Sequence, residues 1–456
     1  MSGAAPDGPA KRPCQRVVEL PDVSSLRERL ECIDGGSTAA DKLCEAQKAC
    51  ASEDWHAGAR TAKRACDIAW QRLHTGHWAE VDAAWRSCYM VASLFAARAQ
   101  WEEAGPAQRT GVQAAQSLRV VDLGLMLGDT SYRALLLRAA DFFEEQLTHD
   151  APTPSRVVDA PSASPSLQQQ PLKLRPLSGP LPPPPHLRLP SLAYFFNECM
   201  VPARPAVLTG VLDGWPAMTT RPWSDLSYLK ERAGHRTVPV EMGRHYLDAD
   251  FEETLLTLGE YIEKHIEGAP AGAPRAYLAQ HQLFEQCPRL RADIVQPDYC
   301  LLSLDDDEEE EDDDNEEESR RVKQRTSTDD RAASSSSGGA GDGVVRVNAW
   351  LGPGGTLSPL HYDRYHNLLC QVVGSKYVRL YAPEQAPNLY PHTEGPHEVS
   401  SQIIDPDDVD ASRFPNFAGA PYVDLVLRAG ECLYIPPRMW HLIESRETSF
   451  SVSFWF

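Results

Sequence analysis

Two histidines and one aspartate carry the clearest chemistry in this sequence. His361 and Asp363 are separated only by Tyr362, and His441 follows far downstream. Two imidazoles and one carboxylate form the ligand set that holds non-haem Fe(II) while leaving coordination positions open. On an extended strand, residues two apart point to the same side, so His361 and Asp363 can coordinate one metal while Tyr362 points away. Because His441 must arrive from a distant strand, the pattern favours a β-barrel that closes around the metal.

A lysine accompanies this cluster. Lys376 follows the turn Gly374-Ser375 and alternates with Val378 and Leu380, so on a strand it shares their apolar face. A buried ammonium is costly unless an anion meets it, and a bound dicarboxylate would supply that anion next to the metal. The alternative is that Lys376 lies close enough to the turn for its side chain to extend into water.

Small polar residues surround the same stretch. Ser358 lies three residues before His361 and Asn367 six after it. Both can hydrogen-bond a carboxylate, and both could equally serve as turn or capping residues. The last eight residues alternate strictly, with one face that must pack on other protein, formed by Phe450, Val452, Phe454 and Phe456. The opposite, more polar face could line a ligand cavity and consists of Ser449, Ser451, Ser453 and Trp455.

Composition limits the class of protein. The net charge is −21, and 13 acidic residues lie between Asp305 and Glu318. Direct nucleic-acid binding is therefore not expected, whereas an Arg- or Lys-rich protein substrate fits the charge. The acidic run could instead be a solvated loop without a binding role. No apolar run reaches the roughly 18 residues that span a bilayer, so no membrane partner is expected. The 11 scattered cysteines indicate free thiols in a reducing compartment.

The order of composition along the chain predicts two domains joined by a spacer. A flexible segment is expected over 1–37, with a short helix around Val23 to Cys32. An α-helical interaction domain follows over 38–150, where Trp78, Val81, Trp85, Cys88 and Phe95 form one apolar stripe. A Pro-rich linker is expected over 151–188. Strands and short helices then alternate over 189–456, with a disordered acidic and Ser/Gly-rich insertion at about 304–343.

Several motifs together resemble the JmjC family of Fe(II)- and 2-oxoglutarate-dependent oxygenases. They are His361-x-Asp363, Lys376, Gly430–Pro436 ahead of Trp440-His441, Tyr277–His281, Asn348–Trp350, Ser358–His361 and Ser451–Trp455. The resemblance covers most of the chain apart from the first residues, the linker and the acidic insertion. It implies an α+β protein, in which an N-terminal α-helical domain precedes a C-terminal double-stranded β-helix (cupin-like, JmjC) domain.

The resemblance also implies roles for individual residues. Fe(II) would be bound by His361, Asp363 and His441. The cosubstrate 2-oxoglutarate, used together with O2, would be contacted by Tyr277, Ser358, Asn367, Lys376 and Trp455, with Lys376 pairing its distal carboxylate. The pocket would be lined by Asn348 and Trp350. Glu241 is a candidate acidic contact for a substrate guanidinium. The sequence departs from the family pattern in its longer acidic insertion and in four residues around Asp363. These four residues, which bear on substrate preference, are Tyr362, Arg364, Tyr365 and His366.

The activity implied is hydroxylation of a protein side chain, with C-3 of arginine as the first expectation. Demethylation of histone N-methyl-lysine needs the same metal and cosubstrate, so the motifs do not separate the two. An endopeptidase acting on methylated histone tails and a non-catalytic cupin scaffold are further alternatives. The expected partners are basic proteins such as histone tails. The expected location is the nucleus and also the cytoplasm, in line with the basic tetrad Arg320-Arg321-Val322-Lys323.

Overall fold

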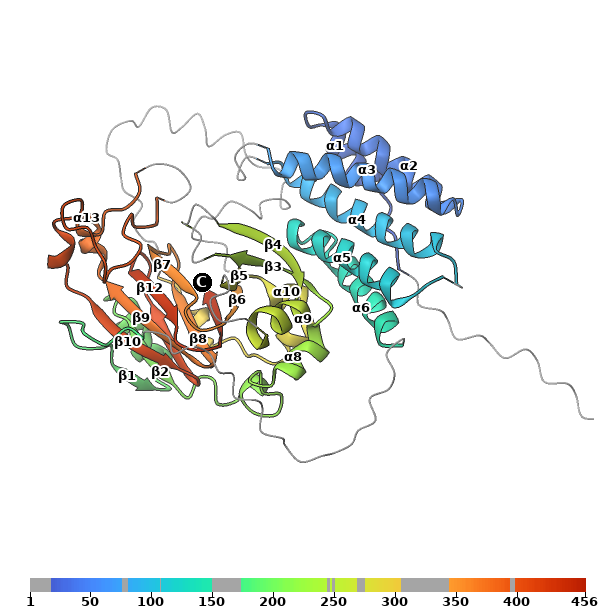
Figure 1. Cartoon of the computed structure of the whole chain (residues 1–456). Coiled ribbons are helices and arrows are strands. Elements are labelled where there is room, and N and C mark those ends of the chain that lie inside the picture. Colours follow the sequence, from blue (N-terminus) through green and yellow to red (C-terminus); the bar gives the residue numbers. More distant parts are fainter. Residues whose placement is uncertain are drawn as a thin grey trace, which may run out of the picture. The chain divides into compact units, whose positions relative to one another are not determined.

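A computed structural model describes residues 18–75, 81–106, 108–149, 174–243, 247, 251–268, 275–304, 344–393 and 398–456. The chain divides into two compact units, Met1–Val158 and Asp159–Phe456 (Figure 1). The acidic insertion from residue 305 onward and residues 151–173 of the Pro-rich linker lie outside the described residues. In the part of the chain that is described, none of the helices is both long and apolar enough to cross a membrane.

The N-terminal unit is built from helices, each of which packs mainly on its neighbours in sequence (Figure 1). They are α1 (Ser24–Glu31), α2 (Gly36–Ala51), α3 (Trp55–Leu73), α4 (Ala83–Glu103), α5 (Gly111–Leu127) and α6 (Arg133–His149). Helix α4 is buried on nearly all sides, which suits its apolar sequence. Trp85, Cys88 and Phe95 of the predicted stripe lie in its core, and Val81 packs against it. Trp78 lies outside the described residues.

Helix α1 lies inside the segment 1–37 that the sequence predicts to be flexible. Its residues Leu26 and Leu30 are buried, at 1% and 0% exposure. Ahead of the helix, the carbonyl of Val18 accepts a hydrogen bond from Arg98 at 2.6 Å. In this structure the helical unit begins before residue 38, and the short helix expected around Val23 to Cys32 is present as α1. The reason is that one short apolar face suffices once a neighbouring helix is present to cover it.

Replacing Leu30 by alanine tests this boundary. Leu30 has no exposed surface, so the change is expected to lower the free energy of unfolding of the helical unit by about 2–5 kcal/mol. Thermal unfolding followed by circular dichroism measures it. The matched control is Glu28→Ala on the exposed side of the same helix, which should leave the transition unchanged. An equal response of both variants would mean that α1 is not part of the core.

Strands form the framework of the C-terminal unit. They are β1 (His186–Arg188), β2 (Ala206–Thr209), β3 (Thr237–Met242), β4 (Glu252–Thr257), β5 (Ala276–His281), β6 (Arg346–Gly352), β7 (Leu357–Tyr362), β8 (Asn367–Val373), β9 (Ser375–Tyr381), β10 (Val423–Arg428), β11 (Glu431–Ile435), β12 (Trp440–Ser445) and β13 (Ser449–Trp455). Within the described residues, one sheet has nine strands in the order β1-β2-β11-β8-β13-β6-β5-β3-β4, and the other has four in the order β10-β9-β12-β7. The α+β class and the double-stranded β-helix are confirmed.

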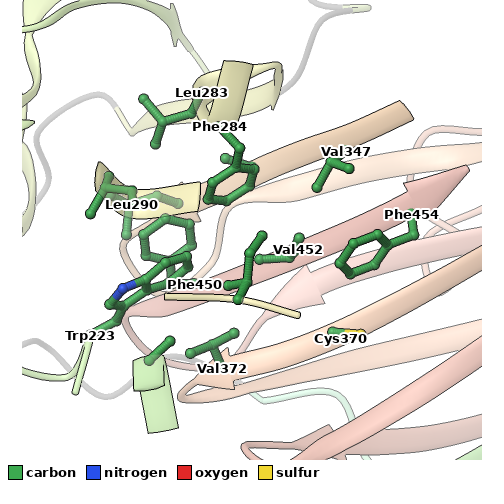
Figure 2. Close-up of a cluster of buried hydrophobic side chains, with 14 of the residues drawn as sticks. Trp223, Leu283, Phe284, Leu290, Val347, Cys370, Val372, Phe450, Val452 and Phe454 are labelled. Atoms are coloured by element: carbon green, nitrogen blue, oxygen red, sulfur yellow. The ribbon is translucent and has the colours of Figure 1, made fainter. Parts of the chain in front are cut away.

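Alternation along the strands separates an inner from an outer face. The larger core lies on the outer face of the nine-stranded sheet, where Phe450, Val452 and Phe454 of β13 pack against covering helices. Figure 2 shows these three side chains on the same side of the sheet as Val372, with Trp223, Phe284 and Leu290 reaching toward them. The predicted apolar face of the last strand is thus buried. Ser451, Ser453 and Trp455 consequently face the space between the sheets.

Short helices cover this outer face (Figure 1). They are α7 (Leu192–Phe195), α8 (Leu226–Ala233), α9 (Leu258–Tyr261), α10 (Leu283–Gln286) and α11 (Pro288–Arg291). In contrast, α13 (Ala386–Leu389) packs on the four-stranded sheet. Two of the covering helices continue as π-helical turns, Phe196–Met200 and Ile262–Glu267. Tyr261 is fully buried at such a junction, and its hydroxyl donates to the carbonyls of Ala276 at 3.0 Å and Leu351 at 2.7 Å.

The end of the predicted linker (151–188) is not a free spacer. Arg175 forms ion pairs with Asp405 at 2.9 Å and Glu444 at 2.6 Å. Two backbone N–H groups that follow it donate to the Asp424 carboxylate at 2.8 and 3.1 Å. Strand β1 then pairs in parallel with β2. Residues 174–188 therefore belong to the C-terminal unit. Proline content could not predict this, because it carries no information on polar contacts to β10 and β12.

Candidate metal centre

Neighbouring strands of the four-stranded sheet bring the three predicted ligands together. His361 on β7 and His441 on β12 are directly opposite each other in the four-stranded sheet, and their ring centroids lie 4.2 Å apart. Asp363 follows β7, and its Oδ2 lies 3.6 Å from Nε2 of His441. One potential ligand atom from each residue lies within 4.8 Å of the others. Residues some 80 positions apart in sequence thus meet at one point because β7 and β12 are neighbours.

Each imidazole is oriented by its own backbone. Nδ1 of His361 donates to the carbonyl of Pro359 at 2.7 Å, and Nδ1 of His441 donates to the carbonyl of Met439 at 2.9 Å. The proton therefore resides on Nδ1 in both rings, and Nε2 keeps a lone pair for a metal. Burial, followed by the nearby His361, lowers the pKa of His441 to about 4. The ring is thus neutral at physiological pH, as metal binding requires.

The turn before β12 is held against the Asp363 segment by a backbone contact. The N–H of Arg438 donates to the carbonyl of Asp363 at 2.7 Å. Arg438 adopts a positive φ of 61°, a conformation that a non-glycine residue takes only where its surroundings enforce it. The sequence does not predict this hydrogen bond, since the residue type of an exposed arginine does not indicate what its backbone N–H contacts.

Lys376 points into the barrel. Its side chain is 1% exposed, so the alternative that it extends into water is wrong. Nζ donates to the hydroxyl of Tyr277 at 3.1 Å and lies 5.9 Å from the ring centroid of Trp350. Burial lowers the pKa of Lys376 to about 7. Among the described residues no carboxylate lies within ion-pair distance of this ammonium, which leaves a buried cation without a counter-anion.

Polar side chains of the neighbouring strands lie around this lysine. The Tyr277 hydroxyl also hydrogen-bonds Ser358, and burial raises the pKa of Tyr277. The indole N–H of Trp350 donates to Oγ of Ser453 at 2.9 Å. Asn348, which is 3% exposed, is the cross-strand partner of Ser453. The residues predicted from the sequence for cosubstrate binding therefore line one interior face.

Asn367 and Trp455 complete this face. They are cross-strand partners between β8 and β13 and are 4% and 8% exposed. Oδ1 of Asn367 and Nε1 of Trp455 are buried and have no hydrogen-bond partner in the described part of the chain. Because buried polar atoms are nearly always paired, orphaned atoms on two paired residues are consistent with a polar ligand that binds there.

Glu241 lies at one end of the nine-stranded sheet. On β3 it is the cross-strand partner of Tyr277 on one side and of Glu253 on the other. It lines a pocket together with Met242, Gly243, Phe251, Tyr277, Thr356 and Leu357. Burial, followed by the charge of Glu253, raises the pKa of Glu241 to about 7. A cationic side chain in this pocket would offset both the desolvation of the Glu241 carboxylate and its repulsion by Glu253.

The residues that depart from the family pattern take separate positions. Tyr362 points away from the cluster and packs edge-on against Trp440, with centroids 4.9 Å apart. Arg364 is exposed. His366 hydrogen-bonds the Tyr434 hydroxyl at 2.8 Å. Tyr365 stacks on Trp455, a contact that sequence reasoning did not anticipate.

Comparison with known proteins agrees with this geometry. Residues 192–456 match the family model of the cupin-like domain, and residues 39–153 match a model described as KDM8-like, N-terminal ARM repeats. The chain is 34% identical over 403 residues to lysine-specific demethylase 8 of Danio rerio, covering 88% of each chain. It is 33% identical over 397 residues to Jumonji C domain-containing protein 5 of Drosophila melanogaster, covering 86% of this chain and 84% of the relative.

The chain belongs to the JmjC family of cupin-fold proteins. A more distant relative of this JmjC protein is the human bifunctional peptidase and (3S)-lysyl hydroxylase JMJD7, at 27% identity over 316 residues, which covers 64% of this chain and 89% of the relative. The resemblance read from His361, Asp363, Lys376 and His441 is thereby confirmed at the level of the family.

Proposed function

We propose that this JmjC protein is an Fe(II)- and 2-oxoglutarate-dependent oxygenase that oxidises a C–H bond on a cationic side chain of protein substrates. One observation carries the proposal. A buried, unpaired Lys376 ammonium faces the same interior as a cluster of two imidazoles and a carboxylate. An anion and a metal would each remove a cost that the folded chain otherwise bears.

The ligand cluster fits Fe(II). Nε2 of His361, Nε2 of His441 and a carboxylate oxygen of Asp363 would hold it, since Nδ1 of each ring is already bonded to a carbonyl. When bound, iron together with 2-oxoglutarate and O2 supplies the oxidising power for C–H hydroxylation, with succinate and CO2 as coproducts. The chain contributes binding, orientation and exclusion of water.

The interior face fits 2-oxoglutarate. Lys376, supported by the Tyr277 hydroxyl, would pair the distal carboxylate. The orphaned indole N–H of Trp455 would donate to one of the other oxygens. Asn367 would donate through its amide NH2, because its Oδ1 is itself an acceptor. Ser358 would add a donor next to Tyr277. Apolar neighbours such as Val378 and Leu380 keep water away from these contacts.

The relatives favour methyl-lysine over arginine as the target. The zebrafish relative is named a lysine-specific demethylase, and the human one a lysyl hydroxylase. C-3 hydroxylation of arginine, the first expectation from the sequence, finds no support in these names. We therefore propose N-methyl-lysine demethylation as the leading reaction, on basic segments such as histone tails, in the nucleus. Hydroxylation of arginine remains the second candidate, since a guanidinium also suits Glu241.

Mass spectrometry of peptides incubated with the enzyme, Fe(II) and 2-oxoglutarate separates the outcomes. Loss of 14 mass units, about one CH2, with release of formaldehyde supports demethylation. A gain of one oxygen supports hydroxylation of arginine or lysine. A cleaved peptide would instead support the peptidase alternative. Absence of succinate with every Arg- and Lys-rich peptide would refute the oxygenase proposal and favour a non-catalytic scaffold.

Glu241→Gln tests the cationic-substrate site. Removing the charge while keeping the shape is expected to raise KM for a basic peptide about tenfold or more, the size of a charge-assisted hydrogen bond. The KM for 2-oxoglutarate should stay the same. Glu252→Gln, an exposed neighbour on β4, is the control and should change neither constant. Equal peptide KM values for wild type and Glu241→Gln would remove Glu241 from the substrate site.

A further inference from the structure

A small stack of side chains lies beside the proposed cosubstrate pocket. The rings of Tyr365 and Trp455 are 5.7 Å apart between centroids, with planes at 15°. The guanidinium carbon of Arg346 lies 5.1 Å from the centroid of the Tyr365 ring, and its Nη1 donates to the Tyr365 hydroxyl at 3.1 Å. Arg346 is also the cross-strand partner of Trp455. We call these three residues the Arg346 stack.

The stack contacts the ring that carries the Trp455 indole N–H. Trp455 is 8% exposed, and its Nε1 has no hydrogen-bond partner within the described ranges. The orientation of this ring in the ligand-free protein therefore depends on packing alone. Stacked aromatic pairs and a cation above a ring both have preferred geometries, so Tyr365 and Arg346 restrict the indole in a way that aliphatic neighbours would not.

Tyr365 also occupies a particular place in the chain. It lies two residues after Asp363 and two before Asn367, in the turn that joins β7 to β8. Asn367 is the other cross-strand partner of Trp455. The stack thus connects the last strand to the segment between β7 and β8, which lies between a proposed metal ligand and a proposed cosubstrate contact.

We infer that Tyr365 and Arg346 are positioning residues, which hold the Trp455 indole N–H in place for a carboxylate oxygen of 2-oxoglutarate. This inference rests on the proposed function. Neither residue touches the cosubstrate; both act through Trp455. A preorganised donor avoids the loss of side-chain freedom on binding, so disrupting the stack weakens cosubstrate binding without removing a contact.

The test compares wild type with Tyr365→Ala, Tyr365→Phe and Arg346→Met. The indole N–H signal of Trp455 is recorded by 15N–1H NMR in the ligand-free protein and assigned by its loss in Trp455→Phe. Binding of 2-oxoglutarate to the Mn(II)-loaded protein is measured by calorimetry. Tyr365→Ala is expected to shift the signal and to raise Kd for 2-oxoglutarate about tenfold, close to the upper range for an aromatic pair. Tyr365→Phe keeps the stacked ring and loses only the hydroxyl that accepts from Arg346, so its effect on both values should be no larger than that of Arg346→Met.

Other results would overturn the inference. An unmoved Trp455 signal in Tyr365→Ala means that the stack does not set the ring. A moved signal with unchanged Kd means that the orientation is irrelevant to binding. A parallel loss of Mn(II) affinity would locate the effect on the Asp363 turn instead. Should Tyr365→Ala fail to fold, Arg346→Met gives the same readings at a half-buried strand end, with an expected rise in Kd of about threefold. If wild type binds no 2-oxoglutarate, the proposed function itself fails, whereas the NMR signal still reports on the stack.

Discussion

Lys376→Met is expected to abolish 2-oxoglutarate binding and to make the ligand-free protein more stable. The variant removes the only proposed partner of the distal carboxylate, so Kd should rise at least about a hundredfold, as for loss of a buried charged partner. The ligand-free stability should increase because burial lowers the pKa of Lys376 to about 7. The cost of holding this ammonium is on the order of 3–5 kcal/mol, and methionine does not incur it.

The pH dependence follows from the same pKa. In the unfolded chain Lys376 titrates near 10.5, so between pH 7 and that value the unfolded state binds more protons. The destabilisation is therefore fully present below about pH 7 and fades as the pH rises toward 10.5. Binding of 2-oxoglutarate needs the charged form, and its affinity should fall above about pH 7. Lys376→Arg should lose this dependence, because a guanidinium stays charged.

Calorimetry and denaturant unfolding from pH 6.5 to 9 measure both effects. Lys264→Met is the matched control: Lys264 is exposed and pairs with Glu260 on the surface, so its loss should change neither affinity nor the pH profile. A Lys376→Met protein that still binds 2-oxoglutarate with native affinity would contradict the assignment of the distal carboxylate to this residue.

Asp363→Ala should eliminate turnover. The carboxylate is the one anionic member of the cluster, and without it two neutral imidazoles remain to hold a divalent metal. The expected loss of Fe(II) affinity exceeds the roughly 10- to 100-fold seen when only a supporting partner of a ligand is removed. Succinate formation should then fall below detection.

Metal content after dialysis and succinate release together measure this prediction. Asp408→Ala, an exposed aspartate in the loop before β10, is the control and should behave as wild type. The fold should survive, since both histidines keep their carbonyl partners and alanine retains the backbone carbonyl that accepts from Arg438. Normal turnover in Asp363→Ala would exclude the three-residue metal site.

Local patterns identified much of the site because they are periodic. His361 and Asp363 lie on the same side of the chain, as do Lys376, Val378 and Leu380. The alternation of the last strand predicted which of its side chains enter the apolar core, although all residues of β13 are buried. Two features at the domain limits could not be read from the sequence. Neither the burial of α1 nor the ion pairs of Arg175 leaves a trace in composition, because both depend on partners distant in sequence.

The sequence by itself determined the kinds of side chain available for chemistry and the faces on which they lie, since a period of two residues needs no knowledge of neighbouring strands. Only the tertiary structure decided that Lys376 is buried rather than solvated. The same holds for the hydrogen bond from the Arg438 N–H to the Asp363 carbonyl and for the stacking of Tyr365 on Trp455. These outcomes depend on which strands become neighbours and on how turns between them close. Such long-range pairing is fixed by packing of the whole barrel, and no short stretch of residues encodes it.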